Sequence, residues 1–498
     1  MGTLSSFDQW NKLCQTITDS STYFNVDQWQ VNGLDVWPLL KTKYLTEASY
    51  FYLADRPLQT PGHNKSSHMR TVIKKLVATA GGVEYIYYLR SLFYRFQLVP
   101  PKLKPDCSVL FLGDHPSFQL CDKTFTQKHI DPLRITLAAN GFPSETMILD
   151  QQPGFLPETA DSLWLKNCHF LTSTERYLRA YCRNIPVNLS SLSGFQAWKT
   201  YVSQKVDLPL ETLVSDEQIK EFIQITLAWR NWFHKFLSSL TLRAIFQISY
   251  YRPPGYALNA VAKELQIPAV DIQHGFEGPF QYAYNYPNLP KSSFNTLPSH
   301  FITWNYIDRD HIKSWGANAG VTATTLGLSD DWLEAQFEQP QTKSLNVTNM
   351  DLNYNQWKST LQNQLKTLCA RTHAKKFLLL TTHYQEDISS LEPLFRYCKE
   401  QQMFIFWRVH PRESKSENFL QEREKQAAGY PIDIRLASSC PLVFILDFVD
   451  LHVTKYSAST LEATAKGVPT LVYSQQGWEV CKKLGEISGI YWIRTPQE

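Results

Sequence analysis

The sequence predicts an α/β protein in which two Rossmann-like domains face each other across a cleft, with a mostly helical N-terminal extension. Its 498 residues are more than one hydrophobic core usually supports. Short apolar runs alternate with helix-like segments in both halves of the chain, which is typical of parallel sheets. A histidine follows an apolar run in each half, His274 in one and His410 in the other. Because ligands bind at the carboxyl ends of parallel strands, this pair indicates one site between two domains.

Composition excludes several classes of protein. Lys and Arg (49) nearly balance Asp and Glu (46), and the formal charge of +3 provides no strong field for nucleic acid. The nine cysteines contain no C-x-x-C pair, which argues against a disulfide framework and a zinc site. The sequence has no basic signal segment and no apolar run of about 18 residues. We therefore expect a cytoplasmic protein that binds no nucleic acid.

Residues 1–105 form the predicted extension, which is rich in Trp, Tyr and Phe. Within it, five apolar side chains at helical spacing share one face: Tyr85, Tyr88, Leu89, Leu92 and Phe96. We expect this segment to be a helix that packs on the next domain. The alternative is peripheral contact with the inner face of the cell membrane, because aromatic and basic side chains suit lipid headgroups.

Residues 106–335 form the first predicted Rossmann-like domain. The run 108–113 is typical of a buried strand, and Asp114 follows it. The remaining expected strands are 145–149, 243–250, 268–272 and 301–304, and the expected helices are 131–141 and 257–265. The sequence therefore repeats the strand, helix, strand unit of a parallel sheet.

Residues 336–355 are polar and rich in Gln, Asn and Thr, as in a linker. The second predicted domain, 356–498, restarts the alternation. Its expected strands are 376–382, the run that ends at His410, 442–446, 450–454 and 468–473, and its expected helices are 388–401 and 459–466. His452 lies inside one of these strands, so we expect it to be structural.

The most specific motif is the hydroxyl-rich loop that leads into the helix at 459–466. Backbone N–H groups at a helix start suit a phosphate or diphosphate, and Ser457, Ser459 and Thr460 add hydroxyl donors. Glu462 has a carboxylate that can accept from ribose hydroxyls. The alternative needs no ligand, because Ser459 and Glu462 also have the spacing of a capping box. The two roles can coexist.

Several of these segments together resemble bacterial surface-polysaccharide glycosyltransferases of GT-B architecture, such as capsule and O-antigen enzymes. The resemblance covers about residues 106–475 and is carried by 273–275 (Gln-His-Gly), 284–287 (Tyr-Asn-Tyr-Pro), 297–304, the His410-Pro411 pair and the Ser-rich loop. It implies a nucleotide-sugar donor in the C-terminal domain and a polysaccharide or glycolipid acceptor in the N-terminal domain. It also implies no metal and no cofactor besides this co-substrate.

The resemblance matches His410 and Pro411 to the family's His-Pro motif, in the domain that holds the donor. Arg408 and His410 make a cationic strand end that can bind the donor phosphate, and Pro411 fixes the turn after the strand. Arg412 either joins them or is a solvated charge paired with Glu413, and the alternative for His410 is an ordinary loop histidine. The nucleotide is left open among CMP, UDP, GDP and dTDP. The His-Pro pattern is shared with enzymes that use CMP-linked acidic sugars, which makes CMP the first to test.

An acceptor hydroxyl needs a base close to neutral pKa, and the candidates are Asp114 and His274, with His115 and Glu277 behind them. Asp114 and His274 rank equally. Gly275 lets a ligand approach the backbone beside His274. The structural alternatives are a turn-forming Asp114 and a His274 whose hydrogen bonds are satisfied in the core.

Other chemistries lack their motifs, since no dinucleotide-binding glycine loop, Walker loop or G-x-S-x-G elbow occurs. The triplet 308–310 (Asp-Arg-Asp) looks like a metal-binding motif, but its helical context favours a solvated helix start. Three alternative functions remain: a nucleotide-sugar epimerase, a polyol-phosphate transferase, and a non-catalytic glycan-binding protein.

Overall fold

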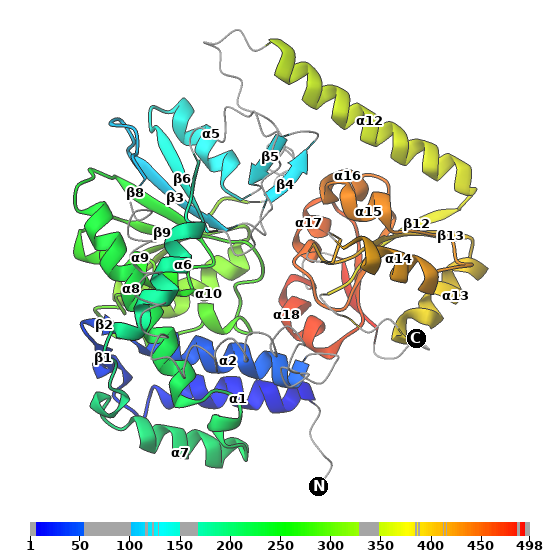
Figure 1. Ribbon diagram of the computed structural model, residues 1–498. Coiled ribbons are helices and arrows are strands. Elements are labelled where there is room, and N and C mark those ends of the chain that lie inside the picture. The colour runs from blue at the N-terminus through cyan, green and yellow to red at the C-terminus, as the bar shows by residue number, and fades with distance from the viewer. Residues whose placement is uncertain are drawn as a thin grey trace, which may run out of the picture.

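The computed structural model describes most of the chain. The described residues are 6–53, 101–114, 118–121, 124–127, 129–149, 168–327, 348–383, 386, 389–411, 413–414, 416–485 and 489–493. They form two α/β units side by side, one with a seven-stranded sheet and one with a six-stranded sheet (Figure 1). The predicted pair of parallel α/β domains with a helical N-terminal region is therefore confirmed. The helix expected at 85–96 lies outside the described residues.

The seven-stranded sheet is parallel throughout, with the order β11-β10-β9-β8-β3-β6-β7. Its strands are β3 (Val109–Asp114), β6 (Ser144–Leu149), β7 (Cys168–Phe170), β8 (Ala244–Ile248), β9 (Ala269–Ile272), β10 (His300–Thr303) and β11 (Thr322–Thr325). The chain builds β3, β6 and β7 in one direction and then β8 to β11 in the other. The strand order therefore reverses between β3 and β8, where ligands bind in open α/β sheets.

The six-stranded sheet is also parallel, with the order β14-β13-β12-β15-β16-β17. Its strands are β12 (Lys376–Thr381), β13 (Met403–Arg408), β14 (Ile432–Asp433), β15 (Leu451–Thr454), β16 (Thr470–Val472) and β17 (Ile490–Trp492). Here the order reverses between β12 and β15, so the second sheet has the same kind of switch point as the first.

Helices cover both sheets. The first unit has α5 (Asp131–Ala139), α6 (Thr172–Tyr181), α7 (Phe195–Val206), α8 (Asp216–Leu237), α9 (Pro253–Glu264) and α10 (Tyr306–Gly316). The second has α12 (Thr348–Thr372), α13 (Glu392–Glu400), α14 (Glu417–Gln426), α15 (Arg435–Ser439), α16 (Leu442–Leu446), α17 (Ser459–Ala465) and α18 (Gln475–Gly485). Among the described residues, the remaining strands form two short antiparallel pairs: β1 (Gln30–Val31) with β2 (Leu34–Asp35), and β4 (Phe118–Cys121) with β5 (Thr124–Gln127).

Residues 442–446 form helix α16, so the strand expected there is wrong. All five of its apolar side chains are buried. A short apolar run that is buried on every side has no periodicity to separate a strand from a helix. Leu365 and its neighbours on α12 pack against this helix.

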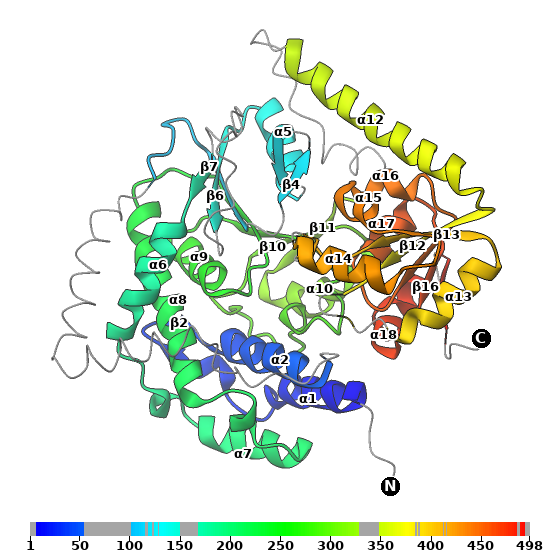
Figure 2. The same ribbon diagram turned by 45° about the vertical axis from the view of Figure 1, so that its right-hand side comes forward.

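The N-terminal helices α1 (Ser6–Ser20) and α2 (Trp37–Leu53) belong to the main core of the first unit. They lie beside α7 in both views (Figures 1 and 2). Indole rings form the contact: the ring of Trp198 on α7 meets those of Trp29 and Trp37 edge to face, each at 5.7 Å between centroids. The indole N–H of Trp198 donates to Ser20 Oγ at 2.7 Å. Residues 6–53 thus contribute to the core of the first domain.

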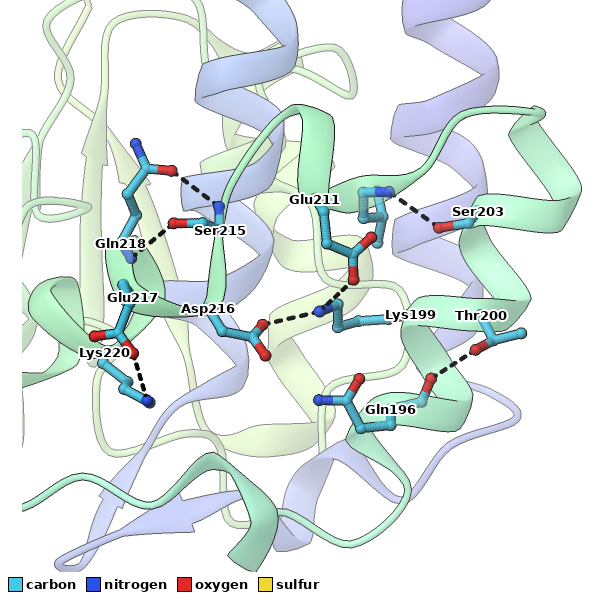
Figure 3. A network of polar contacts seen from close by, with 11 residues as sticks. Gln196, Lys199, Thr200, Ser203, Glu211, Ser215, Asp216, Glu217, Gln218 and Lys220 are labelled. Carbon is cyan, nitrogen blue, oxygen red and sulfur yellow. Dashed lines mark hydrogen bonds and ion pairs between the residues drawn. The ribbon is translucent and has the colours of Figure 1, made fainter.

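Polar contacts fasten α7 to the start of α8 (Figure 3). Ser215 and Gln218 form a capping box, in which each side chain bonds to the backbone N–H of the other residue. The buried ammonium of Lys199 lies 2.8 Å from Asp216 Oδ1 and 2.6 Å from Glu211 Oε1. Two carboxylates offset the cost of burying this cation.

Helix α12 begins at Thr348, inside the segment 336–355 expected to be a linker. Residues 328–347 lie outside the described part of the chain, so the domain boundaries stay predictions. Among the described helices, none combines the length and apolarity that crossing a membrane requires.

Gly255 in the first turn of α9 is a packing constraint beside the end of β8. A Cβ at this position would overlap the backbone carbonyl of Tyr250. We expect Gly255→Ala to cost about 1 to 3 kcal/mol of stability through overpacking, although Ala favours a helix over Gly by about 1 kcal/mol. Thermal unfolding should show a lower Tm. Gly278→Ala is the control, because its Cβ would lie 3.6 Å from Asp308 Oδ1, an ordinary contact. Equal melting of the two variants would contradict the expectation.

Candidate functional site

His274 lies just beyond β9, and hydroxyl groups from the end of β8 orient its ring. His274 Nε2 is 2.8 Å from Ser249 Oγ and 3.1 Å from Tyr251 Oη. Ser249 has a left-handed backbone with φ of 57°, which is uncommon for residues other than glycine. Such backbone strain clusters at functional sites. His274 is therefore part of a polar group at the switch-point edge of the first sheet.

Asp114 is the last residue of β3, and its backbone lies opposite Leu149 of β6. Since β3 is the direct neighbour of β8, Asp114 at the end of β3 and Ser249 just after β8 lie at the same edge of the sheet. The Asp114 side chain and His115 lie outside the described part of the structure. The choice between Asp114 and His274 as the base stays a prediction.

Gln273 shapes the turn that carries His274. Its fully buried side chain donates from Nε2 to the carbonyl of Gly275 at 2.6 Å and to Asp308 Oδ2 at 2.5 Å. Its Oε1 accepts from the backbone N–H of Trp304 at the end of β10. One amide side chain therefore ties the ends of β9 and β10 together and holds the His-Gly turn. Gln273 belongs to the Gln-His-Gly motif, but its structural role can be recognised only from its contacts with Trp304 and Asp308, which are distant in sequence.

Three buried carboxyl groups lie behind this turn. Asp271 accepts from Tyr284 Oη at 2.7 Å and from the backbone N–H of Tyr250 at 3.1 Å, and burial raises its pKa to about 8. Glu277 is 1% exposed, and neither of its carboxyl oxygens has a hydrogen-bond partner among the described residues. Burial raises the pKa of Glu277 well above its usual range, and the nearby Asp271 and Asp308 raise it further.

Asp308 is buried, so the solvated helix start expected for the 308–310 triplet is wrong at its first residue. Its carboxylate accepts from Gln273 and, at 2.8 Å, from Asn305 Nδ2, and burial raises its pKa. Asp310 instead pairs with Arg309 at the surface, at 2.8 Å. The described residues contain no group of three or more His, Cys, Asp or Glu side chains that could hold a metal. The triplet is thus a buried hydrogen-bonding residue followed by a surface ion pair.

In the second sheet, His410 has a neighbour that the sequence analysis missed. Thr381 at the end of β12 lies opposite Arg408 at the end of β13. His383 and His410 each follow two residues later, and their ring centroids are 6.0 Å apart. The signal was present in the sequence, because His383 also comes directly after an apolar strand-like run.

Arg408 uses part of its guanidinium to hold the protein itself. Its Nη1 donates to the carbonyl of Ala437 at 2.8 Å and to the carbonyl of Cys440. Pro411 is exposed and begins a turn in which the backbone N–H groups of Glu413 and Ser414 donate to the His410 carbonyl. Arg408 therefore anchors the end of α15 next to His410. Arg412 lies outside the described residues.

The hydroxyl-rich loop is organised differently from the expected capping box. Helix α17 begins at Ser459 itself, and its N-cap residue, Ala458, makes no side-chain cap, while Ser457 Oγ accepts from the backbone N–H of Ser459 at 3.3 Å. Ser459 Oγ instead lies 2.8 Å from Ser457 Oγ, 3.0 Å from Thr381 Oγ1 and 3.2 Å from His452 Nε2. The capping-box alternative is therefore wrong, because Ser459 is already helical and its hydroxyl faces the sheet.

The other residues of this motif differ in exposure. Thr460 and Glu462 are buried along with Ser459, whereas Ser457 is half-buried. His452 is completely buried, with its Nδ1 3.1 Å from Thr470 Oγ1, and burial lowers its pKa to about 3. His452 thus has the structural environment expected of it. The ligand roles of the loop residues stay predictions, and Ser457 has the most accessible side chain.

Aromatic rings join the strand ends of the two sheets. Phe276, two residues after His274, stacks on Tyr456 at 5.9 Å between ring centroids. The Tyr456 ring lies 6.4 Å from that of His383. Around this stack, an apolar cluster combines Trp304 of the first unit with buried side chains of the second: Leu461, Val472, Cys481, Leu484 and Ile490. The strand ends that carry His274, His383 and His410 therefore meet at one junction.

No family model matches the sequence, and no curated protein matches it. Among solved structures, a UDP-GlcNAc 2-epimerase from Methanocaldococcus jannaschii in complex with UDP-GlcNAc and UDP is 12% identical, covering 78% of this chain and 88% of that chain, with a TM-score of 0.42. A UDP-glucosyltransferase from Polygonum tinctorium is 11% identical, covering 78% and 83%, with a TM-score of 0.38.

The wall teichoic acid polymerase TagF is also 11% identical, covering 80% of this chain and 78% of that chain, with a TM-score of 0.38. Similarities this distant assign no activity. The sheets and the aromatic contacts of this chain define it as a two-domain α/β protein. The strand ends that carry its histidines meet between the two domains.

Glu277 provides a test of the buried carboxyl group. In the unfolded chain this carboxyl ionises near pH 4.3, at about its ordinary pKa, whereas its raised pKa keeps it protonated in the folded state. Each pH unit above the unfolded pKa therefore costs the folded state about 1.4 kcal/mol, until the folded pKa is reached. We expect Glu277→Met to raise Tm, and to raise it more at pH 8 than at pH 5.

The control is Glu221→Met on the exposed face of α8, which should change Tm little and equally at both pH values. Thermal unfolding in matched buffers measures both variants. A Glu277→Met gain that is the same at pH 5 and pH 8 would show that the carboxyl is not protonated in the folded protein.

Proposed function

We propose that this protein is a glycosyltransferase that moves a sugar from a nucleotide-activated donor to a surface polysaccharide or glycolipid acceptor, without a metal. The observation that carries the proposal is the junction of strand ends, where the Phe276 and Tyr456 stack connects His274 to His383 and His410. Sugar transfer needs a base at the acceptor and a hydrogen-bonding group at the departing phosphate, facing each other across one reaction centre.

The second domain is the donor side in this proposal. The His410 imidazole and the Ser457 hydroxyl donate hydrogen bonds to the donor phosphate, and Arg408 adds positive charge behind the strand end. Charge-assisted hydrogen bonds to the leaving nucleotide stabilise the negative charge that develops on it. Ser459, Thr460 and Glu462 support this loop from within, in keeping with their burial. Among donors, CMP-linked sugars are the first candidates.

The first domain is the acceptor side, with Asp114 or His274 as the base. His274 is held ready by the hydroxyls of Ser249 and Tyr251, and a positioned imidazole is a common general base near neutral pH. The reaction takes place in the cytoplasm, and the acceptor is presented at the inner face of the cell membrane.

Donor binding gives the first test of these roles. A thermal-shift panel of CMP, UDP, GDP and dTDP should identify one nucleotide that stabilises the wild-type protein. His410→Ala and Ser457→Ala should weaken its binding about tenfold or more, since a hydrogen bond to a charged group contributes about 1.5 to 3 kcal/mol. His234→Ala on α8 is the control, because its half-exposed ring lies outside the junction.

Turnover gives the second test. His274→Ala and Asp114→Asn should be compared in a transfer or donor-hydrolysis assay, where loss of the base lowers the rate about 10²- to 10⁴-fold with donor affinity unchanged. If both variants react at the wild-type rate, neither Asp114 nor His274 is the base.

Product analysis decides which reaction is catalysed. An altered free nucleotide sugar would indicate an epimerase, and a transferred polyol phosphate would indicate a polyol-phosphate transferase. A protein that binds none of the four nucleotides would favour a non-catalytic glycan-binding role.

A further inference from the structure

We infer that His383 is a second phosphate-binding imidazole beside His410, and that the buried Glu386 positions it. The inference deepens the proposed function and rests on it for the identity of the ligand, a nucleotide phosphate. Three observations support it. The ends of β12 and β13 are in register, Glu386 bonds to the His383 backbone, and β12 borders the switch point of the second sheet.

Strand register places the two imidazoles side by side. Thr381 at the end of β12 is paired with Arg408 at the end of β13. Because the two strands are parallel, His383 and His410, each two residues further on, come at the same height above the sheet edge. The ring centroids of His383 and His410 are accordingly 6.0 Å apart, with the ring planes at 48°. At this spacing both rings can reach oxygens of one phosphate, or of two linked phosphates.

His383 also lies closer to the switch point than His410 does. The second sheet reverses its order between β12 and β15, and ligands of open α/β sheets bind at this reversal. His383 follows β12 itself, whereas His410 follows β13, one strand further out. The ring of Tyr456, which follows β15 on the other side of the switch, lies 6.4 Å from that of His383.

Glu386 anchors the backbone of His383. Its side chain is 2% exposed, and its Oε2 accepts from the His383 backbone N–H at 2.6 Å. Its Oε1 bonds to Tyr473 Oη, just after β16, and its carbonyl accepts from Arg423 Nη2 on α14 at 2.8 Å. Burying a carboxylate is costly unless hydrogen bonds satisfy it. Here those bonds hold the carboxylate that fixes the His383 backbone, and Glu386 acts by positioning.

The chemistry of the groups favours an anion over a metal ion. Imidazole N–H groups of His383 and His410 are donors, and the Ser457 hydroxyl lies in the following loop of the same sheet edge. Among the described residues, no cluster of three metal-ligating side chains occurs here or elsewhere. Paired donors of this kind suit phosphate oxygens.

Calorimetric titration with inorganic pyrophosphate and with CMP tests the inference on the full chain. His383→Phe keeps a ring but loses the hydrogen bonds, and we expect binding about 10- to 100-fold weaker, the range for a lost bond to a charged group. His383→Gln keeps an N–H donor and should recover part of the affinity. The histidine ring proton resonances of His383 and His410 should shift with pyrophosphate, while that of His234 should not.

The positioning role of Glu386 has its own variants. Tyr473→Phe removes one hydroxyl that bonds to Glu386, and we expect a loss of affinity of about threefold to tenfold, since one hydrogen bond of this network is lost. Glu386→Gln keeps an acceptor for the His383 backbone and should bind more tightly than Glu386→Ala. Tyr430→Phe is the matched control, because its hydroxyl bonds to the exposed Glu392 at 3.3 Å.

The outcomes separate this inference from the proposed function. Loss of pyrophosphate and CMP binding in His410→Ala but not in His383→Phe would overturn the inference and leave the transferase proposal standing. Absence of any pyrophosphate or nucleotide binding by the wild-type protein would overturn the inference as well. If pyrophosphate and CMP binding requires both His383 and His410 but no sugar is transferred, the inference is supported and the proposed glycosyltransferase activity is wrong.

Discussion

The stacking of Phe276 on Tyr456 is the contact on which the candidate site depends. It joins the carboxyl end of β9 to that of β15, next to the switch point of the second sheet. The surrounding apolar cluster removes these rings from water, and apolar burial provides the non-directional attraction that holds two such surfaces together. Polar groups can then be placed around the stack, because they are not needed to hold it.

Buried hydrogen bonds give this junction its specific geometry. On the first side, Gln273 links the ends of β9 and β10, and the hydroxyl of Ser249 meets the His274 ring. On the second side, Glu386 links the His383 backbone to β16 and α14. The bonds from Gln273 to Trp304 and from Glu386 to Tyr473 and Arg423 join segments distant in sequence, and the side chains of Gln273 and Glu386 are buried. Such groups hold a site in one arrangement before any ligand binds, which lowers the cost of ordering it.

Local patterns predicted most strands and helices, because the spacing of apolar residues along the chain matches the period of the strand or helix that buries them. They failed at 442–446, where a run buried on all sides looks the same in either structure. At the site, the sequence pointed to His274, His410 and Ser457 but missed His383, which only strand register pairs with His410. It also placed Asp308 in solvent, since a carboxylate's burial depends on partners distant in the chain.

The sequence by itself determined the two parallel α/β domains and the histidines at their strand ends, because both follow from hydrophobic periodicity and from where strands stop. The tertiary structure decided which strand ends meet, which hydroxyls contact His274, and that Ser459 faces the sheet instead of capping its helix. The physical reason is that strand order and domain contact bring together groups such as Phe276 and Tyr456 that lie far apart along the chain, and no local pattern encodes that pairing.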